Sequence, residues 1–354
     1  YAGRPNLPKC GDVMVAHTTI YDGGFMNEDN RLCGVDLISG EVKWFFPTDT
    51  ESRYYCYFNG NGYVYGEKLV FQYQADARTY EARDYHTTVC IDAKTGEILW
   101  AEKGKSGYSS VNVQVVGDDV GRCFFLLDST RVRCADLQAG TVADFFDSDT
   151  LQINDLSLSG NSLVLSCCSK SGKAYHYRSY AIVLDKDSGG EQLFVPLVEN
   201  RILPHCILCQ GILWGNVGTF ISAVDVKNGK WLWSRDDWCA DYVGDIGVYG
   251  DVLMKCAEDA ITGYNVKTGE VVYSYPHYGA WHTSFDGRYA YLINRKNKLD
   301  IIDIETGKIL DTVTCKYDTE YDGFGLSYPM IYNGKLYIMG GNSLFRYSVY
   351  PWKR

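Results

Sequence analysis

Aromatic and imidazole side chains gather in two neighbouring stretches in the second half of the chain, and a tyrosine pair precedes them near its start. These residues are Trp238, Tyr242, His277, Tyr278, Trp281, His282, Tyr54 and Tyr55. Such rings bury a large area on binding at a small cost in conformational entropy, and many keep a polar atom for hydrogen bonding. They predict a recognition surface for a protein, a peptide or a glycan. The alternative is that each ring only covers an edge of the fold.

A second set of residues has polar side chains, several of which bind cations or transfer protons, and we expect each to begin an innermost strand of the fold. The set is Asn6, Asn61, Asn112, Asp155, His205, Asp245, His282 and Tyr328. His205 and Asp245 join the predicted binding residues, whereas a ring of solvated side chains without a metal is the commoner outcome. No hydrolase elbow, zinc-protease, P-loop or EF-hand pattern occurs, so no catalytic residue is assigned. The sequence favours a non-enzymatic protein and leaves the question open.

Cysteine chemistry is a further option, because the chain has 13 cysteines. An odd number leaves at least one thiol free or paired between chains. Cys206 and Cys209 form a C-x-x-C pattern, but on an extended strand residues three apart face opposite sides, which disfavours a shared metal. Cys167 and Cys168 are adjacent. They either close a strained disulfide ring or are two neighbouring strand residues without chemistry.

A short phrase that recurs seven times supplies the elements that position these groups. Each copy is a hydrophobic strand ending in an acidic or amide residue, then a glycine four residues later, then a second strand, which is typical of a hairpin. The glycine takes the left-handed backbone conformation that side chains resist. The seven glycines are Gly40, Gly96, Gly140, Gly189, Gly229, Gly269 and Gly307.

The period of this phrase predicts the architecture. The glycines recur about every 44 residues, which is the length of one four-stranded propeller blade with its turns. Dividing the 354 residues by this period gives nearly eight. We therefore expect a single all-β domain over residues 1–354, an eight-bladed β-propeller whose ring closes between the N- and C-terminal strands. The eighth blade lacks a copy of the phrase, so its fourth strand comes from the first residues of the chain or is absent.

A large ring follows the turn glycine by four residues in four copies, as Trp44, Trp100, Trp233 and Tyr273. We expect these rings to wedge against the neighbouring blade. The third, fourth and seventh copies have Asp144, Leu193 and Asp311 at this position instead. Those three junctions are expected to pack more loosely.

The fullest copies of the phrase follow the pattern A-x-D-x-x-T-G-x-x-x-W, best matched by residues 90–100 and 223–233. This pattern resembles the tryptophan-docking motif of the pyrroloquinoline quinone (PQQ)-like β-propeller repeat, and the resemblance covers nearly the whole chain. It is closer to the non-catalytic lipoprotein scaffold of the outer-membrane β-barrel assembly machine than to the quinoprotein dehydrogenases. That resemblance implies a scaffold without a cofactor. The alternative is a small PQQ-dependent dehydrogenase with an axial cofactor and calcium, because quinoprotein alcohol dehydrogenases have a pair like Cys167 and Cys168 over the cofactor.

Composition limits the classes of partner and the cellular compartments that we expect for this protein. The formal net charge of −10 and the lack of a basic stripe argue against nucleic acid. No run reaches the ~18 to 20 apolar residues of a membrane span. The chain begins with Tyr1, which is consistent with a trimmed leader. We expect a periplasmic or otherwise extracytoplasmic protein, with a lipoprotein anchor as one option and the cytoplasm still open; the sequence does not indicate the oligomeric state.

Blade topology places the predicted residues at one end. Connections between blades and loops from second to third strands leave one end of a blade, which we name the connection end. The other two turns of each blade leave the opposite end, named the turn end. The recognition residues fall in connections, so we predict that function lies at the connection end.

Overall fold

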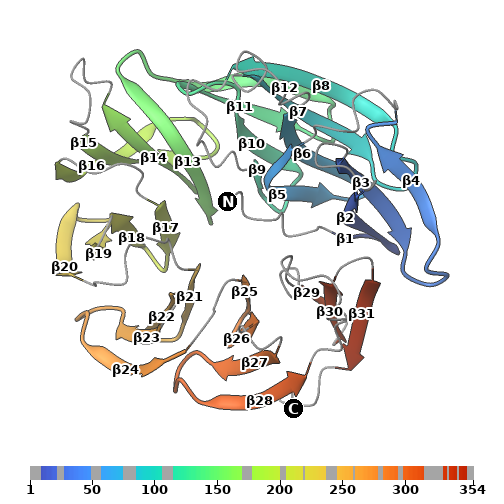
Figure 1. Ribbon diagram of the computed structural model, residues 1–354. Helices are drawn as coiled ribbons and strands as arrows, with labels where there is room; N and C mark the ends of the chain where they lie inside the picture. Colours follow the sequence, from blue (N-terminus) through green and yellow to red (C-terminus); the bar gives the residue numbers. More distant parts are fainter. Residues whose placement is uncertain are drawn as a thin grey trace. The chain divides into compact units, whose positions relative to one another are not determined.

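The computed structural model describes residues 9–21, 28–48, 57–74, 85–105, 115–169, 178–199, 205–217, 220–236, 245–257, 260–277, 282–293, 298–314, 330–332, 335–340 and 343–348. Every regular element in these ranges is a β-strand (Figure 1). The all-β class is therefore as predicted. The chain divides into two compact units, Tyr1–Leu208 and Cys209–Arg354, and each is described by itself.

The first unit contains four blades, in each of which the strands pair in chain order as antiparallel neighbours. Blade one has β1 (Lys9–Cys10), β2 (Val13–Tyr21), β3 (Glu28–Asp36) and β4 (Val42–Phe46). Blade two has β5 (Tyr57–Tyr65), β6 (Lys68–Gln74), β7 (Tyr85–Asp92) and β8 (Ile98–Lys105). Blade three has β9 (Val115–Gly117), β10 (Arg122–Leu126), β11 (Arg131–Asp136) and β12 (Thr141–Asp147). Blade four has β13 (Leu151–Ser159), β14 (Ser162–Ser169), β15 (Arg178–Asp185) and β16 (Glu191–Glu199).

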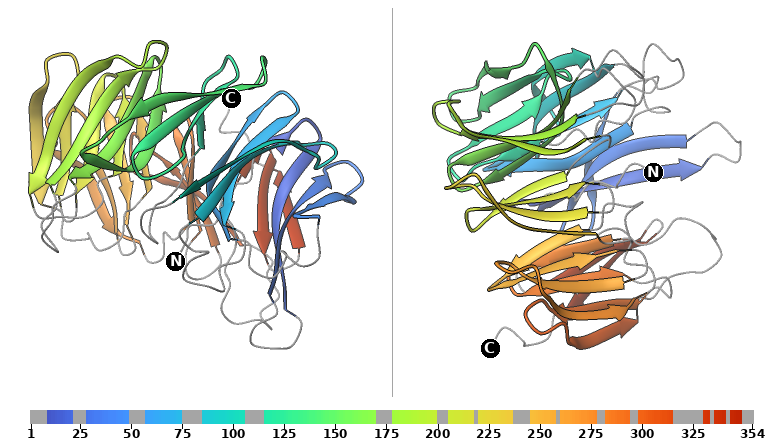
Figure 2. Two further views of the ribbon diagram at one scale, coloured as in Figure 1. Left: turned by 90° about the horizontal axis from the view of Figure 1, so that it is seen from above. Right: turned by 90° about the vertical axis from the view of Figure 1, so that its left-hand side faces the viewer.

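The remaining sheets have the same pattern, which Figure 2 shows from two further directions, and the second unit begins at the last residue of the first strand of blade five. Blade five has β17 (His205–Cys209), β18 (Ile212–Val217), β19 (Phe220–Asp225) and β20 (Lys230–Asp236). Blade six has β21 (Asp245–Tyr249), β22 (Val252–Cys256), β23 (Ala260–Asn265) and β24 (Val271–Pro276). Blade seven has β25 (His282–Asp286), β26 (Tyr289–Ile293), β27 (Lys298–Asp303) and β28 (Ile309–Thr314). The last sheet has β29 (Met330–Tyr332), β30 (Lys335–Gly340) and β31 (Ser343–Ser348).

The prediction of an eight-bladed propeller needs correction. The described residues form seven four-stranded blades, and the remaining sheet has only the three strands β29, β30 and β31. The physical reason is local: the chain after residue 311 has no further copy of the hairpin phrase, so no turn directs a fourth strand back along the sheet. Residues 1–8, the predicted source of that strand, lie outside the described residues. The single domain closed between its termini therefore stays a prediction.

The repeated hairpins form because the acidic residue and the glycine satisfy the turn backbone together. In the second copy, one carboxylate oxygen of Asp92 accepts hydrogen bonds from the Lys94 and Thr95 N–H groups, both at 2.9 Å. Gly96 N–H donates to the Asp92 carbonyl at 2.8 Å, and the φ angle of Gly96 is 77°. All seven turn glycines have positive φ, which confirms that prediction. The register of β7 against β8 shifts between Cys90 and Ile91, so a β-bulge at Leu99 follows the turn.

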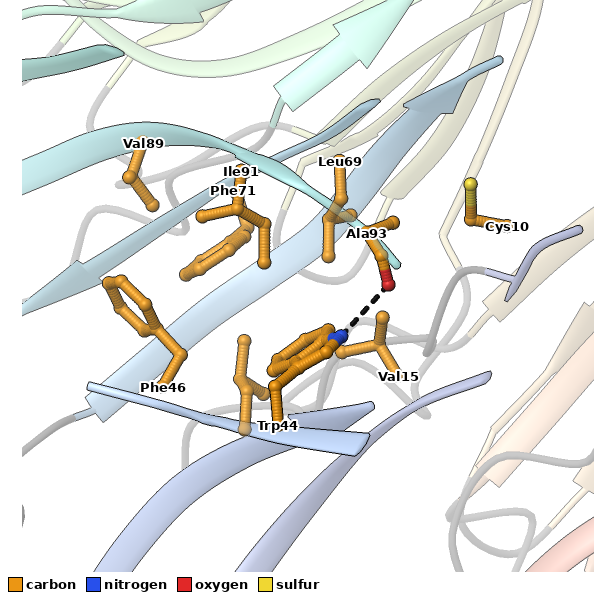
Figure 3. Packing of buried hydrophobic residues seen from close by; sticks show 10 residues of the cluster. Cys10, Val15, Trp44, Phe46, Leu69, Phe71, Val89, Ile91 and Ala93 are labelled. Carbon is orange, nitrogen blue, oxygen red and sulfur yellow. Dashed lines mark hydrogen bonds between the residues drawn. The ribbon is translucent and has the colours of Figure 1, made fainter. Parts of the chain in front are cut away.

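The rings that follow the turns join one blade to the next, as predicted. Trp44 is 6% exposed, and its indole N–H donates to the Ala93 carbonyl of blade two at 2.9 Å (Figure 3). Its ring lies over Gly96, where an added Cβ would be 2.8 Å from the ring. Figure 3 shows this ring among the apolar side chains that blades one and two share. The turn therefore needs a glycine for two reasons. Its φ is positive, and a side chain at this position would collide with the Trp44 ring.

The same contact recurs in the second unit. Trp233 lies over Gly269 and donates to the Val266 carbonyl at 3.1 Å. The Tyr273 hydroxyl donates to the Ile304 carbonyl at 2.6 Å, with its ring over the turn glycine of blade seven. The accepting carbonyl always belongs to the residue after the turn's acidic or amide residue. This shared acceptor fixes the register of each blade against its neighbour.

Trp100 departs from this arrangement. An added Cβ at Gly140, the turn glycine of blade three, would meet nothing within 4 Å. Trp100 instead stacks on Phe125 of blade three, with ring centroids 5.9 Å apart. The Lys68 ammonium donates to the Leu137 carbonyl, which is the acceptor that an indole reaches at other junctions.

Charged side chains join blades three and four, where Asp144 stands in place of the ring. Arg122 contacts Asp187 at 2.5 Å, and Lys186 lies 3.3 Å from the buried Asp118 carboxylate. The next residue along β12, Phe145, packs edge-on against Phe124, with centroids 4.8 Å apart. Contacts between charged side chains thus take the place of the missing ring. The looser packing expected at this junction stays a prediction.

Candidate functional site

The two ends of the blades are built differently. At the turn end, two residues join the first and second strands in every four-stranded blade but the third, as Gly66 and Glu67 do between β5 and β6, and residues 118–121 join them in blade three. The third and fourth strands are joined by the repeated turn, whose carboxylates accept backbone N–H groups. In Asp36 a hydrogen bond from the Lys43 ammonium, with the N–H groups of Ser39 and Ile38, lowers the carboxyl pKa to about 2. The polar groups of this turn are therefore satisfied within the blade.

The connection end carries most of the predicted recognition residues. Tyr54, Tyr55, Trp238, Tyr242, Tyr278 and Trp281 lie outside the described residues. The strand bounds still place them in the connections from β4 to β5, from β20 to β21 and from β24 to β25. Each of these connections leads from the outermost strand of one blade to the innermost strand of the next, so the chain path agrees with the predicted end.

Three predicted residues begin innermost strands, as expected: His205 begins β17, Asp245 begins β21 and His282 begins β25. Their side chains lie outside the described residues. Asp155 does not begin its strand, because β13 starts at Leu151. Residues 151–153 pair with residues 167–169 of β14 upstream of a bulge, and the Ile153 N–H also donates to the Ser129 carbonyl of blade three at 2.7 Å. Asn61 also lies inside its strand, β5, and the remaining members, Asn6, Asn112 and Tyr328, lie outside the described residues.

His277 is the predicted recognition residue whose contacts the structure describes. It follows β24 and is buried, with Nε2 2.9 Å from a carboxylate oxygen of Asp300 on β27. The other oxygen of Asp300 accepts a hydrogen bond from the Thr312 hydroxyl at 2.6 Å. Because a carboxylate accepts, Nε2 carries the proton of this hydrogen bond. His277 thus joins blade six to blade seven through a carboxylate that is itself held in place.

Two polar atoms beside this pair have no hydrogen-bond partner among the described residues. They are the His277 Nδ1 atom and the Tyr275 hydroxyl, and both are buried. Burial raises the pKa of Tyr275, and the nearby Cys256 and Asp300 raise it further, so the phenol keeps its proton. The site thus holds a neutral phenol and an imidazole nitrogen next to the connection that contains Trp281. This arrangement suits hydrogen bonding to a neutral polar group or to water.

A second buried polar network joins blades two and three. His86 Nε2 and the Gln72 side-chain amide both donate to the Leu126 carbonyl, at 2.9 and 3.0 Å. The same amide donates to the Thr88 hydroxyl at 2.7 Å. Burial lowers the pKa of His86, so its ring is neutral near pH 7. This imidazole therefore joins blades rather than carrying a charge at the surface.

The adjacent cysteines lie inside blade four. Cys167 belongs to the buried core of this blade, and Cys168 is 3% exposed. They face Tyr180 and Ser179 along β15. Cys168 is a free thiol, so no disulfide joins it to its neighbour. Burial raises the pKa of this thiol, and the nearby Asn154 side chain partly opposes that rise.

The buried position of the two cysteines does not fit a disulfide that covers an axial cofactor. In the part of the chain that the structure describes, no three His, Cys, Asp or Glu side chains gather as calcium or another metal would require. The absence of a cofactor stays a prediction, and so does the PQQ alternative.

Sequence reasoning missed Asp300 and Gln72. One signal was available, because Asp300 and Gln72 interrupt otherwise apolar strands at positions that are buried. A buried polar residue of this kind needs a partner. Spacing alone does not indicate that the partner of Asp300 is His277 in another blade.

Compared by sequence, the chain matches neither a protein-family model nor a curated protein. Compared by structure, it is similar to the computationally designed protein Ika8 (TM-score 0.64, 13% identity, 97% of this chain and 95% of that chain). It is also similar to BamB from Moraxella catarrhalis (TM-score 0.57, 13% identity, 97% and 92%). The chain thus shares a β-propeller fold with these two proteins.

Two enzymes share this fold. One is a europium-containing methanol dehydrogenase (TM-score 0.60, 13% identity, 93% of this chain and 80% of that chain). The other is the dihydro-heme d1 dehydrogenase NirN in complex with DHE (TM-score 0.63, 12% identity, 99% and 74%). At these identities the likeness shows the fold alone. Because two named dehydrogenases and a designed protein share it, the fold does not decide between enzyme and scaffold.

Proposed function

We propose that the protein is a non-enzymatic binding or scaffold propeller that captures a protein, peptide or glycan partner at its connection end. The observation that carries this proposal is the contrast between the two ends of the blades. The turn end consists of short turns whose polar groups are satisfied internally. The connection end has the longer segments, and these contain Trp238, Tyr242, Tyr278 and Trp281. Loops on a rigid scaffold are where recognition residues concentrate.

The two imidazoles with described contacts support this choice over catalysis. His86 donates to a backbone carbonyl and His277 to Asp300, and both rings are buried at blade junctions. A general base must reach the proton that it abstracts. These two rings instead stiffen the blades from which the aromatic connections leave. A rigid platform lowers the ordering cost of binding.

A double substitution tests the proposed binding end. Replacing Trp238 and Trp281 together by alanine should abolish binding to any ligand that wild-type protein selects from an arrayed set of peptides and oligosaccharides. Trp231→Ala is the matched control, because Trp231 is 38% exposed on β20 near the turn end. Thermal unfolding should show that the double variant keeps its fold. Unchanged binding by the double variant, or equal loss in the control, would contradict the proposal.

Cofactor addition tests the alternative enzyme. Purified protein is mixed with PQQ and calcium, and quinone absorbance is measured after gel filtration together with oxidation of alcohols and sugars. We expect neither retained absorbance nor oxidation. Retained quinone with turnover would replace the scaffold proposal by the dehydrogenase alternative.

The compartment belongs to the same proposal. In the part of the chain that the structure describes, no helix is long and apolar enough to cross a membrane. We propose an extracytoplasmic location, which fractionation of the source cells checks. Recovery of the full-length protein from the cytosol would contradict it.

A further inference from the structure

The outermost strand of blade six has an open edge. Among the described residues, β24 pairs with β23 on one side and with no strand on the other. Unpaired backbone N–H and C=O groups along such an edge can pair with another chain. Proteins usually prevent this by placing charged residues or prolines on the edge strand.

Among the seven outermost strands in four-stranded blades, six carry a charged residue and β24 carries none, so its edge has only a bulge at Val272 and its last residue, Pro276, as protection. The protecting charged residues are Lys43 on β4, Glu102 on β8, Asp144 on β12, Glu191 on β16, Arg235 on β20 and Asp311 on β28. The sequence of β24 is VVYSYP, which has no charge, and its proline is the last residue.

The side chains of β24 fall into two groups. Val271 is 49% exposed, Val272 is 50% exposed, and Ser274 is exposed as well. Tyr273 and Tyr275 are half-buried, and Tyr273 is anchored to the Ile304 carbonyl of blade seven. The strand is therefore held firmly while it presents an uncharged edge. The valines occupy the exposed positions where partner contacts would form.

We propose that the outer edge of β24 accepts an extended, uncharged segment of a partner polypeptide by β-strand addition. This surface is separate from the connection-end patch and does not depend on it. The edge backbone would bind the segment through main-chain hydrogen bonds. Val271, Val272 and Ser274 would favour small apolar and hydroxyl side chains on the segment. A charged residue on the segment would lose water beside the valines without gaining a counter-ion on β24.

The size of the edge favours a segment over a second folded copy. A six-residue strand is about 20 Å long and strands pair about 5 Å apart, so the contact strip covers only about 100 Å². A stable interface between folded proteins needs about 800 Å² on each partner. Strand addition suits a narrow strip because affinity comes from main-chain pairing.

Peptide binding tests the proposal directly. The probe is a fluorescein-labelled peptide of eight alternating threonine and valine residues, and the control peptide is the same sequence with N-methylated backbone amides. Fluorescence anisotropy should show binding of the first peptide and none of the second. Hydrogen exchange should show new protection of the β24 amides. No binding at millimolar peptide, or protection confined to other strands, would overturn the proposal.

Substitutions locate the edge. Val272→Lys should weaken peptide binding by about tenfold or more, because a charge on the edge opposes strand addition. Leu232→Lys on β20 is the matched control, because Leu232 is 38% exposed on a strand that is already charged, and it should leave binding unchanged. Circular dichroism confirms that both variants fold. Equal binding by Val272→Lys and wild type would overturn the proposal, as would a concentration-dependent homodimer that Val272→Lys dissolves, since the occupant would then be a second copy.

Discussion

Replacing Gly96 by alanine should destabilise the first unit more than the same change at Gly140. Both glycines close the repeated turn with similar backbone angles, a φ of 77° at Gly96 and 70° at Gly140. Each substitution therefore places a side chain in the left-handed region, which lowers the free energy of unfolding by about 1 to 2 kcal/mol. The two positions differ in what the new Cβ meets. At Gly96 it would lie 2.8 Å from the Trp44 ring, whereas at Gly140 it would meet nothing within 4 Å. Forcing a methyl group into a packed contact costs about 1 to 3 kcal/mol more.

The expected loss is thus about 2 to 5 kcal/mol for Gly96→Ala and about 1 to 2 kcal/mol for Gly140→Ala. Urea unfolding followed by circular dichroism measures both free energies of unfolding. A double-mutant cycle with Trp44→Ala isolates the steric part, because Gly96→Ala should cost no more than Gly140→Ala once the ring is gone. Equal losses in the two single variants, or an unchanged cost of Gly96→Ala without the ring, would refute the docking of Trp44 on this turn.

Three further predictions follow from described contacts. Trp44→Ala should cost about 3 to 5 kcal/mol, because it removes a large buried ring and its hydrogen bond, and urea unfolding measures the loss. Asp300→Ala should cost about 1 to 3 kcal/mol by leaving the buried His277 N–H without an acceptor, which thermal unfolding checks; an unchanged melting temperature would contradict the pair. The Asp36 carboxyl should titrate near 2 by NMR, and because this folded pKa is depressed, its contribution to stability is present above the ordinary value of 3.8 and is lost as the pH falls through about 2. Lys43→Met should move that titration midpoint upward.

The repeated hairpins were predictable because their determinants are local. An acidic side chain and a glycine four residues later fix the turn without help from the rest of the chain, so every turn glycine has the expected φ. The number of complete blades was not predictable from the period, because dividing a length by a repeat cannot show that the last sheet lacks a strand. The sequence also did not indicate which residue the Trp100 ring contacts. Its spacing matches that of Trp44, yet its ring stacks on Phe125 because Gly140 lies away from it.

Prediction of the site failed where contacts join distant parts of the sequence. His277 was singled out for its ring type, but the carboxylate that holds it belongs to Asp300, 23 residues later in another blade. Asp155 was expected to begin a strand, and a bulge with upstream pairing places it in the middle of β13 instead. Periodicity gives the order of strands, whereas bulges and junction contacts set where a given side chain lies.

Strand β24 connects the two proposed surfaces through its own anchors. Tyr273 fixes the strand to the Ile304 carbonyl, and His277 just past its end pairs with Asp300, so two contacts with blade seven hold one short strand. The exposed Val271 and Val272 directly precede the first anchor, Ser274 lies between the two, and the connection with Tyr278 and Trp281 begins directly after the second. A strand held at two points loses little conformational freedom when a partner binds. The same contacts that fix blade register therefore prepare both the edge and the start of the aromatic connection for binding.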